Sequence, residues 1–285
     1  MSMWSLLELF PIGSRVNILD VGAALVQESP PYQSLIDAGV GRLFGFELDP
    51  QACARLNQKY GEPHRFFQCF VGDGRPATFH ETNWGPTGSL YAPNSRLLEK
   101  FQNLAELVTP VATHAVNTAR MDDIAELHDV DFLKIDVQGS ELSILQNATR
   151  TLSSTLVVQV EVEFVELYQG QPMIADVDIF LRAQGFQFHT FSDIAGRAFK
   201  PLAPKDALNS GFRQYLWSDA IYVRDWMHLE NLSEVKLRNY AILAHDLLGS
   251  YDLAHFVLAA LDRSTKGNLA TAYVQRLTAS GSMKS

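Results

Sequence analysis

The stretch Val130-Asp-Phe-Leu-Lys-Ile-Asp-Val-Gln-Gly-Ser-Glu-Leu-Ser-Ile-Leu145 decides the fold of this chain. Its apolar run stops at Asp136, Gly139 provides a turn, and Leu142 and Leu145 follow at helical spacing. The pattern predicts a buried strand that carries a carboxylate to its own C-terminal end, followed at once by a helix. In open α/β sheets this edge is where ligands bind.

Two upstream stretches repeat this design. Ile18-Leu-Asp-Val-Gly-Ala23 and Leu43-Phe-Gly-Phe-Glu-Leu-Asp49 are both apolar runs that reach an acidic residue just before a loop. Near-continuous apolar strands that alternate with helices predict an α/β fold with a doubly wound, mostly parallel sheet. The strand candidates are residues 16–19, 43–46, 65–70, 131–135, 156–162, 186–191 and 217–223.

Two regions depart from this alternation. Residues 72–94 contain Gly, Pro and aromatic residues without helical spacing, which predicts a long irregular segment of the kind that carries function. After Asp225, apolar residues recur at helical spacing and predict two or three short helices. We therefore expect a Rossmann-like domain in residues 1–225 and an α-helical C-terminal extension in residues 226–285.

The composition is that of a globular protein, with 47% hydrophobic and 19% charged residues. The formal net charge of -9 opposes binding to nucleic acid. The two cysteines, Cys53 and Cys69, fit a reducing compartment. Residues 1–10 lack the pattern of a signal peptide, and the chain has no apolar run of membrane-spanning length. We expect a cytoplasmic protein without nucleic-acid or membrane partners.

The first two strand ends predict a site for an adenosine-containing ligand. Asp20 closes the first strand, Gly22 lets the backbone approach a ligand, and the small Ala23 keeps the space open. Glu47 closes the second strand, where a carboxylate can accept both hydroxyls of a ribose. A dinucleotide would need the pattern Gly-x-Gly-x-x-Gly, of which only Gly22 is present. S-adenosylmethionine, which has no phosphates, fits better.

The run Lys134-Ile-Asp-Val-Gln-Gly-Ser-Glu141 resembles the Lys-Ile-Asp-Val-(Glu/Gln)-Gly-x-Glu element of FkbM-type S-adenosylmethionine-dependent methyltransferases, which have the class I methyltransferase fold. Residues 20–23 resemble the cofactor loop of that family, and residues 45–50 its ribose-binding strand end. The resemblance extends over residues 16–224. It implies methyl transfer, usually to a hydroxyl oxygen of a sugar, glycan or related natural product.

The resemblance also implies roles for two carboxylates. Asp136, at the end of the fourth strand, should lie near the methyl end of the cofactor, with Glu161 of the fifth strand beside it. We expect one of them to accept the proton of the acceptor hydroxyl or to bind the acceptor, because neighbouring carboxylates raise one another's pKa. Asp73 lies where class I enzymes often contact the adenine amino group, and an ordinary Asp-Gly turn is the alternative.

Four further residues are candidates for binding the acceptor. Glu163 and Tyr168 follow the fifth strand and could line the acceptor pocket at the sheet edge. Trp84 and Tyr91 lie in the irregular segment and could stack on a sugar ring, although lone aromatic residues in loops more often serve local packing. The acceptor itself is a small molecule or a glycan.

Two charged residues of the diagnostic run have structural alternatives. Lys134 lies inside a strand, where we expect an ion pair rather than a catalytic role. Glu141 follows a candidate helix cap at Ser140, where the helix dipole favours a carboxylate; contact with the substrate is the alternative.

Other interpretations stay open. We assign no metal ligands, although Mg²⁺ needs only one or two protein carboxylates and could be held by Asp136, Glu161 and Glu163. A nicotinamide-dependent oxidoreductase is the second enzymatic alternative, and the missing phosphate-binding glycines count against it. A non-catalytic docking platform that uses the helical extension is the third. The sequence leaves open whether the chain forms a homodimer.

Overall fold

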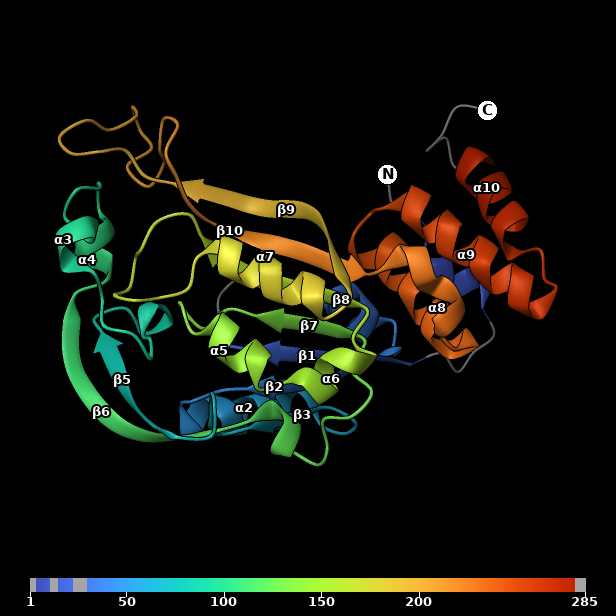
Figure 1. The fold of residues 1–285 in the computed structure, drawn as a ribbon, viewed down its shortest axis with the longest axis horizontal. Coiled ribbons are helices and arrows are strands. Elements are labelled where there is room, and N and C mark those ends of the chain that lie inside the picture. Colours follow the sequence, from blue (N-terminus) through green and yellow to red (C-terminus); the bar gives the residue numbers. More distant parts are fainter. Residues whose placement is uncertain (1–3, 11–14, 23–29, 280–285) are drawn as a thin grey trace.

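The computed structural model of the protein describes residues 4–10, 15–22 and 30–279. Its centre is a seven-stranded sheet with the order β3-β2-β1-β7-β8-β10-β9 (Figure 1). The neighbours among β3, β2, β1, β7 and β8 pair in parallel, and β10 is antiparallel to both of its neighbours. The predicted mostly parallel sheet is therefore confirmed. The strands are β1 (Val16–Val21), β2 (Gly41–Phe46), β3 (Arg65–Phe67), β7 (Phe132–Ile135), β8 (Val157–Glu163), β9 (Phe186–Gly196) and β10 (Tyr215–Arg224).

The register of the parallel strands brings the predicted acidic ends to one edge. Asp20 pairs with Gly45 of β2 and with Lys134 of β7, so these three strands end at nearly the same level. Glu47 and Asp136 directly follow β2 and β7. The order of the strands reverses between β1 and β7, which is the place where open α/β sheets bind ligands.

Helices cover both faces of the sheet because successive side chains of a strand point to opposite sides. Leu19 and Leu133 pack against α5 (Glu141–Gln146), α6 (Thr149–Ser154) and α7 (Ile174–Ala183), which lie in front of the sheet in Figure 1. Ile18 and Phe132 face the other side. That core includes residues of η1 (Leu6–Leu9), α1 (Gln33–Asp37), α2 (Pro50–Tyr60) and the C-terminal helices.

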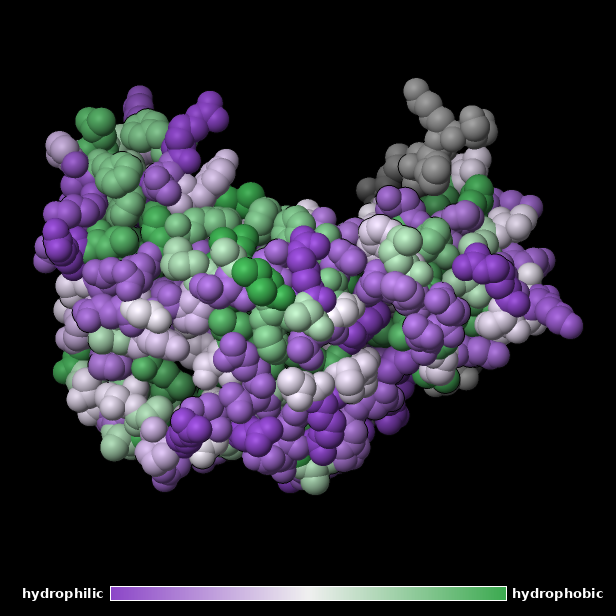
Figure 2. Space-filling model, viewed as in Figure 1, coloured by the Kyte–Doolittle hydropathy of each residue, from purple (hydrophilic) through white to green (hydrophobic). Residues whose placement is uncertain are grey.

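The C-terminal helices belong to the same hydrophobic core as the sheet. They are η4 (Trp226–Asn231), α8 (Glu234–Ile242), the π-helical segment η5 (Leu243–Leu247), α9 (Tyr251–Thr265) and α10 (Leu269–Ala279). Their buried faces pack on Val157, Ile221 and Val223 of the sheet, and the surface that they present in Figure 2 is largely hydrophilic. The part of the chain that the structure describes contains no helix with the length and hydrophobicity needed to cross a bilayer.

A buried polar contact also ties these helices to the sheet. The Asp131 carboxylate is fully buried just before β7. Lys236 Nζ of α8 lies 2.6 Å from Asp131 Oδ1, and Asn239 Nδ2 donates to Asp131 Oδ2 at 3.0 Å. The predicted boundary after residue 225 marks where the last strand ends and the C-terminal helices begin. The sheet and these helices nevertheless pack together through this contact and the shared hydrophobic core.

A second, three-stranded sheet was not expected from the sequence. It has the order β4-β6-β5 and consists of β4 (Phe70–Val71), β5 (Pro76–Thr82) and β6 (Pro110–Ala119). The prediction that residues 72–94 are irregular throughout is thus wrong for β5, and the predicted strand 65–70 is divided between two sheets. β5 pairs with a strand about thirty residues later, and Thr82 alone of its residues is buried, so neither a local pattern nor a buried apolar run marks it. Short helices η2 (Gly85–Thr87), α3 (Ser95–Leu98), α4 (Leu104–Leu107) and η3 (Met121–Asp123) complete the described structure.

Candidate active site

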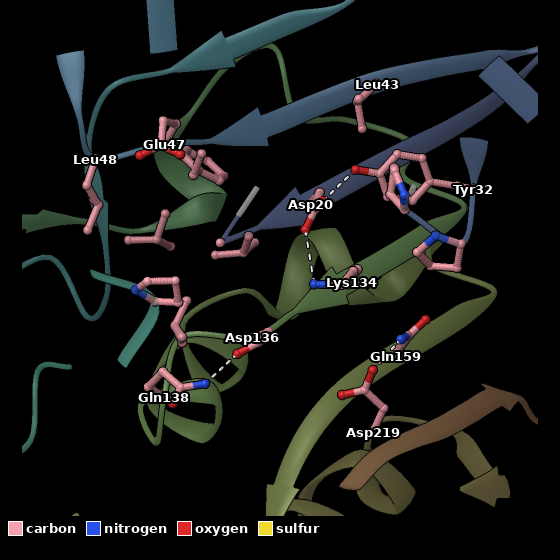
Figure 3. A pocket seen from close by; sticks show the side chains of 18 of the residues that line it. Asp20, Tyr32, Leu43, Glu47, Leu48, Lys134, Asp136, Gln138, Gln159 and Asp219 are labelled. Atoms are coloured by element: carbon pink, nitrogen blue, oxygen red, sulfur yellow. Dashed lines mark hydrogen bonds and ion pairs between the residues drawn. The ribbon is translucent and has the colours of Figure 1, made fainter. Parts of the chain in front are cut away.

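A cavity of about 1130 Å³ opens at the C-terminal ends of β1, β2 and β7 and continues across one face of the sheet (Figure 3). Four of the predicted site residues line it, namely Asp20, Gly22, Glu47 and Asp136. Small-molecule sites usually measure roughly 300–1,000 Å³. This cavity therefore has room for a nucleoside-sized ligand and for part of a second molecule.

Asp20 lies at the floor of the cavity and is only 4% exposed. The hydroxyl of Tyr32 donates to Asp20 Oδ2 at 2.5 Å, and Lys134 Nζ lies 3.7 Å from Asp20 Oδ1. Figure 3 shows Tyr32 and Lys134 approaching this carboxylate from two directions. Oδ1 has no hydrogen-bond partner among the described residues. Burial raises the pKa of Asp20, and the charge of Lys134 opposes that shift.

The expected ion pair of Lys134 is therefore confirmed. Burial lowers the pKa of Lys134, but the surrounding carboxylates, with Asp20 first and Asp136 next, outweigh it and the pKa is raised. An ammonium group that keeps its proton balances the negative charge of the cavity floor and cannot act as a base at neutral pH. This electrostatic role agrees with its position inside strand β7.

Gln159 and Asp219 extend the polar floor beyond Lys134. Gln159 lies beside Lys134 in β8, and its Nε2 donates to Asp219 Oδ2 of β10 at 2.5 Å. Both residues line the cavity, and Figure 3 shows them next to each other. Sequence reasoning missed them. The available signal was a polar residue, Gln159, within an otherwise apolar strand.

Gly22 makes the loop after β1 fit against the end of β7. Its φ of +91° lies in the region that favours glycine, and a Cβ atom there would lie 2.1 Å from the backbone oxygen of Asp136. The predicted need for glycine therefore has a specific structural cause, which is the close approach of two strand ends. Ala23 lies outside the described residues.

Glu47 follows β2 directly and forms part of the cavity wall (Figure 3). Asp49 N donates to Glu47 Oε1 at 2.9 Å, which holds the side chain in place. Burial raises the pKa of Glu47, and hydrogen bonds from the backbone of Asp49 and Leu48 oppose this shift. The partly buried carboxylate keeps acceptor capacity for the hydroxyls of a ligand.

Asp73 does not line the cavity. Its carboxylate accepts a hydrogen bond from Arg75 N at 2.9 Å and closes the turn between β4 and β5. This is the geometry of the Asp-Gly turn that was the alternative to adenine contact. The neighbouring Cys69, Phe70 and Val71 reach the cavity instead.

A group of carboxylates lies at the ends of β7 and β8. One oxygen from each of Asp136, Glu141 and Glu161 falls within 4.8 Å of the others. Burial, followed by the charges of Asp136 and Glu163, raises the pKa of Glu161 well above its ordinary value. Of this group only Asp136 is among the described residues that line the cavity, and Glu161 lies behind it. The arrangement pairs a cavity-facing carboxylate with a neighbour whose pKa is raised.

Glu141 has a structural role at the start of α5. Its side chain is 2% exposed and accepts hydrogen bonds from Val137 N at 2.8 Å and from Gly139 N at 2.9 Å. Burial raises its pKa to about 7, with the backbone hydrogen bonds opposing the shift. Glu141 thus holds the loop that presents Asp136 and does not line the cavity.

Gln138 connects the two predicted catalytic residues, and sequence reasoning did not single it out. Its Nε2 donates to Asp136 Oδ1 at 2.8 Å and to Glu161 Oε2 at 2.6 Å. The hydroxyl of Tyr168 lies 3.1 Å from Gln138 Oε1. The backbone of Gln138 has a φ of +60°, an uncommon value outside glycine, so the loop aims this side chain at the carboxylates.

The four residues expected to bind the acceptor lie outside the cavity wall. Trp84 is 48% exposed, and Tyr91 packs against a separate apolar cluster. Glu163 is 3% exposed, and Tyr168 is buried with its hydroxyl donating to Thr87 O at 2.9 Å. The neighbouring loop residues Pro86, Gly88, Ser89 and Leu90 reach the cavity instead. Tyr168 therefore supports the wall from behind.

Comparison with known proteins gives a consistent result. A family model described as the methyltransferase FkbM domain matches residues 20–188. The chain is 33% identical over 153 residues to the 2-O-methyltransferase NoeI of Sinorhizobium fredii (strain NBRC 101917 / NGR234). That match spans 48% of this chain and 60% of the relative, so the chain covers less than two thirds of its length.

Solved structures give more distant matches. Magnesium protoporphyrin IX methyltransferase from Synechocystis PCC 6803, with bound SAM, is 12% identical with a TM-score of 0.38, over 74% of this chain and 71% of that one. TrmK of M. capricolum, in complex with S-adenosyl-homocysteine, is 9% identical with a TM-score of 0.36, over 88% and 93%. Likeness at this level is too distant to assign a function.

Proposed function

This chain belongs to the FkbM methyltransferase family, and from that premise we propose that it transfers a methyl group from S-adenosylmethionine to a hydroxyl oxygen of a sugar or glycan. The observation that carries the proposal is the shared cavity of Gly22, Glu47 and Asp136, at the ends of three adjacent parallel strands. The 2-O-methyltransferase activity named for the relative supports oxygen as the acceptor atom.

The cavity residues fit this cofactor. Glu47 is available to accept the two ribose hydroxyls, and Gly22 lines the same cavity without a side chain. Asp20 contributes negative charge at the floor of the same cavity, with Tyr32 on one of its oxygens and Lys134 near the other, and so favours a cationic group such as the ammonium of a methionine moiety nearby. When bound, S-adenosylmethionine supplies a methyl group on a sulfonium that is already activated for displacement.

The protein then has to position the acceptor and take up one proton. Asp136 faces the cavity and is the group we assign to the hydroxyl proton of the acceptor. Glu161 stands behind it with a raised pKa, so that at neutral pH the pair carries fewer charges than two free carboxylates would. The methyl group moves to the acceptor oxygen, and the proton of that oxygen moves to Asp136.

A polar acceptor agrees with the side chains around Asp136. Ser89, Gln159 and Asp219 line the same cavity and offer hydroxyl, amide and carboxylate groups that can bind sugar hydroxyls. Metal chemistry is not required by this scheme, because Asp136 and Glu161 already share a protein donor in Gln138.

Calorimetric titration tests the cofactor. We expect S-adenosylhomocysteine to bind the purified protein and NADH not to bind. Binding of NADH alone would favour the oxidoreductase, and binding of neither would favour a non-catalytic role for the sheet and its helical extension. The same titration with Glu47→Gln identifies the cavity as the binding site, because the affinity should fall.

Labelled S-adenosylmethionine tests the acceptor. The protein is incubated with it and with a cell extract separated into glycans, lipids, small metabolites and proteins. We expect label in a sugar-containing fraction, in a bond that resists mild base as a methyl ether does. Label that mild base releases would indicate a methyl ester and would contradict transfer to a hydroxyl.

A further inference from the structure

The side-chain amide of Gln138 lies between two carboxylates that would otherwise need a counter-charge. Its two N–H groups point at Asp136 Oδ1 (2.8 Å) and Glu161 Oε2 (2.6 Å). Each carboxylate receives a donor from the same nitrogen, so the amide sets their separation. Figure 3 shows Gln138 reaching toward Asp136 from the loop that follows β7.

The orientation of this amide is defined by its surroundings. Gln138 Oε1 lies 3.1 Å from the hydroxyl of Tyr168, whose single proton has Thr87 O as a second acceptor at 2.9 Å. The backbone oxygen of Gln138 accepts a hydrogen bond from Ser89 Oγ at 2.6 Å and fixes the loop. A flipped amide would turn its oxygen toward Asp136 Oδ1, and an ionised carboxylate offers only acceptors. The contacts therefore keep the N–H groups on the side of Asp136 and Glu161.

The same group has the spacing of a metal site, but several of its oxygens already accept hydrogen bonds from the protein. Three carboxylate oxygens within 4.8 Å of one another could coordinate one divalent cation. Both oxygens of Glu141 accept hydrogen bonds from backbone N–H groups of the loop after β7. Asp136 Oδ1 and Glu161 Oε2 accept from Gln138. A cation at this place would therefore compete with protein donors on each of the three carboxylates.

We propose that Gln138 is a positioning residue that holds Asp136 and Glu161 together in place of a divalent cation, and that the neutral side chain at position 138 makes this site independent of metal. This inference rests on the proposed function in one respect, which is that the proposed function makes Asp136 the base. The contacts themselves involve the protein alone, so they can be tested without an acceptor.

The first test adds one charge. Gln138→Glu keeps the length of the side chain but replaces its donors by a fourth carboxylate, and affinity for a hard cation rises with the number of charged oxygens. We expect Mn²⁺, followed by electron paramagnetic resonance near neutral pH, to bind this variant at least about tenfold more tightly than it binds the unchanged protein. Gln169→Glu, at an exposed position nearby, is the matched control and should behave like the unchanged protein.

Tight binding of Mn²⁺ to the unchanged protein would overturn the proposal, and so would failure of a folded Gln138→Glu to gain affinity. If that variant does not fold, a second comparison decides. Gln138→Met removes the donors without adding charge, and its stability should fall more steeply than that of the unchanged protein as pH rises from about 5 to about 8, because Glu161, whose pKa is raised in the folded protein, then ionises without that donor. If Gln138→Met loses the same amount of stability at all pH values, Gln138 has a packing role only.

These outcomes separate from those of the proposed function. If the unchanged protein does not bind S-adenosylhomocysteine, the methyltransferase proposal is refuted, while the cation and pH results still test the role of Gln138. Normal binding of S-adenosylhomocysteine together with tight Mn²⁺ binding by the unchanged protein would refute the role of Gln138 alone.

Discussion

A Cβ atom on Gly22 would lie 2.1 Å from the backbone oxygen of Asp136, so the residue that follows strand β1 and the residue that follows strand β7 are in direct contact. No side chain fits between them. Gly22 and Asp136 are 114 residues apart in the sequence (136 − 22 = 114). They belong to the two stretches that most clearly indicated a ligand site, and the fold brings them into contact. The position of Asp136 depends on the absence of a side chain at residue 22.

Gly22→Ala should therefore destabilise the protein for two reasons. A left-handed backbone costs a non-glycine residue about 1–2 kcal/mol, and overpacking a filled site adds about 1–3 kcal/mol. Gly39→Ala is the control, since Gly39 follows the end of helix α1 with a φ of +72° and has nothing within 4 Å of the added Cβ atom. Urea unfolding of both variants should show a larger loss of unfolding free energy for Gly22→Ala than for the control. Equal losses would mean that the added methyl group at residue 22 is accommodated without cost.

Asp136→Asn should lower the rate of methyl transfer by roughly 10²–10⁴-fold if Asp136 is the general base. Glu161→Gln should lower it less, because Glu161 lies behind Asp136 and already tends to keep its proton. Initial rates with labelled cofactor and the acceptor fraction identified above measure both, and binding of S-adenosylhomocysteine shows that the variants are folded. Near-normal rates in both variants would refute the assignment.

Glu47→Gln should weaken the binding of S-adenosylhomocysteine by roughly 10–100-fold, since hydrogen bonds to a charged group contribute about 1.5–3 kcal/mol. Asp73→Asn should leave the affinity unchanged, because Asp73 closes a turn and does not line the cavity. Titration calorimetry compares the two. A large effect at Asp73 with none at Glu47 would place the adenosine elsewhere.

The buried glutamates should make the protein less stable as pH rises. Burial raises the pKa of Glu163 well above its ordinary value, so the folded state binds a proton that the unfolded state has already released. Stability is then lost as pH rises from about 4.5 through the folded pKa. Glu163→Gln should remove part of this loss, so its advantage over the unchanged protein should be greater near pH 8 than near pH 5. Chemical unfolding at both values, with the exposed Glu99→Gln as control, measures the difference.

Lys236→Met tests whether the C-terminal helices are part of the same cooperative unit. It would leave the buried Asp131 carboxylate without its ion-pair partner, and breaking a buried pair in this way costs about 3–5 kcal/mol. We expect one unfolding transition shifted to lower denaturant concentration, with Lys205→Met at an exposed position unchanged. Two separate transitions would instead support independent units divided near residue 225.

Local patterns sufficed for the parts of the site that are built by strand ends. Asp20, Glu47 and Asp136 each follow an apolar run, and parallel strands bring such ends to one edge regardless of the rest of the chain. An ion pair of Lys134 could also be anticipated, since a lysine inside a strand needs a partner, but the structure identified that partner as Asp20. These predictions use only the two-residue periodicity of strands and the geometry of parallel pairing.

The tertiary structure alone decided which side chains act together. β5 and β6 pair across a long interval, so no local pattern marks the second sheet. Tyr32 reaches Asp20, and Gln138 reaches Glu161, only because the folded chain brings separate segments within hydrogen-bond distance. The sequence determined where carboxylates would gather, because that depends on strand periodicity. Their partners, burial and protonation depend on contacts between distant segments, which exist only after folding.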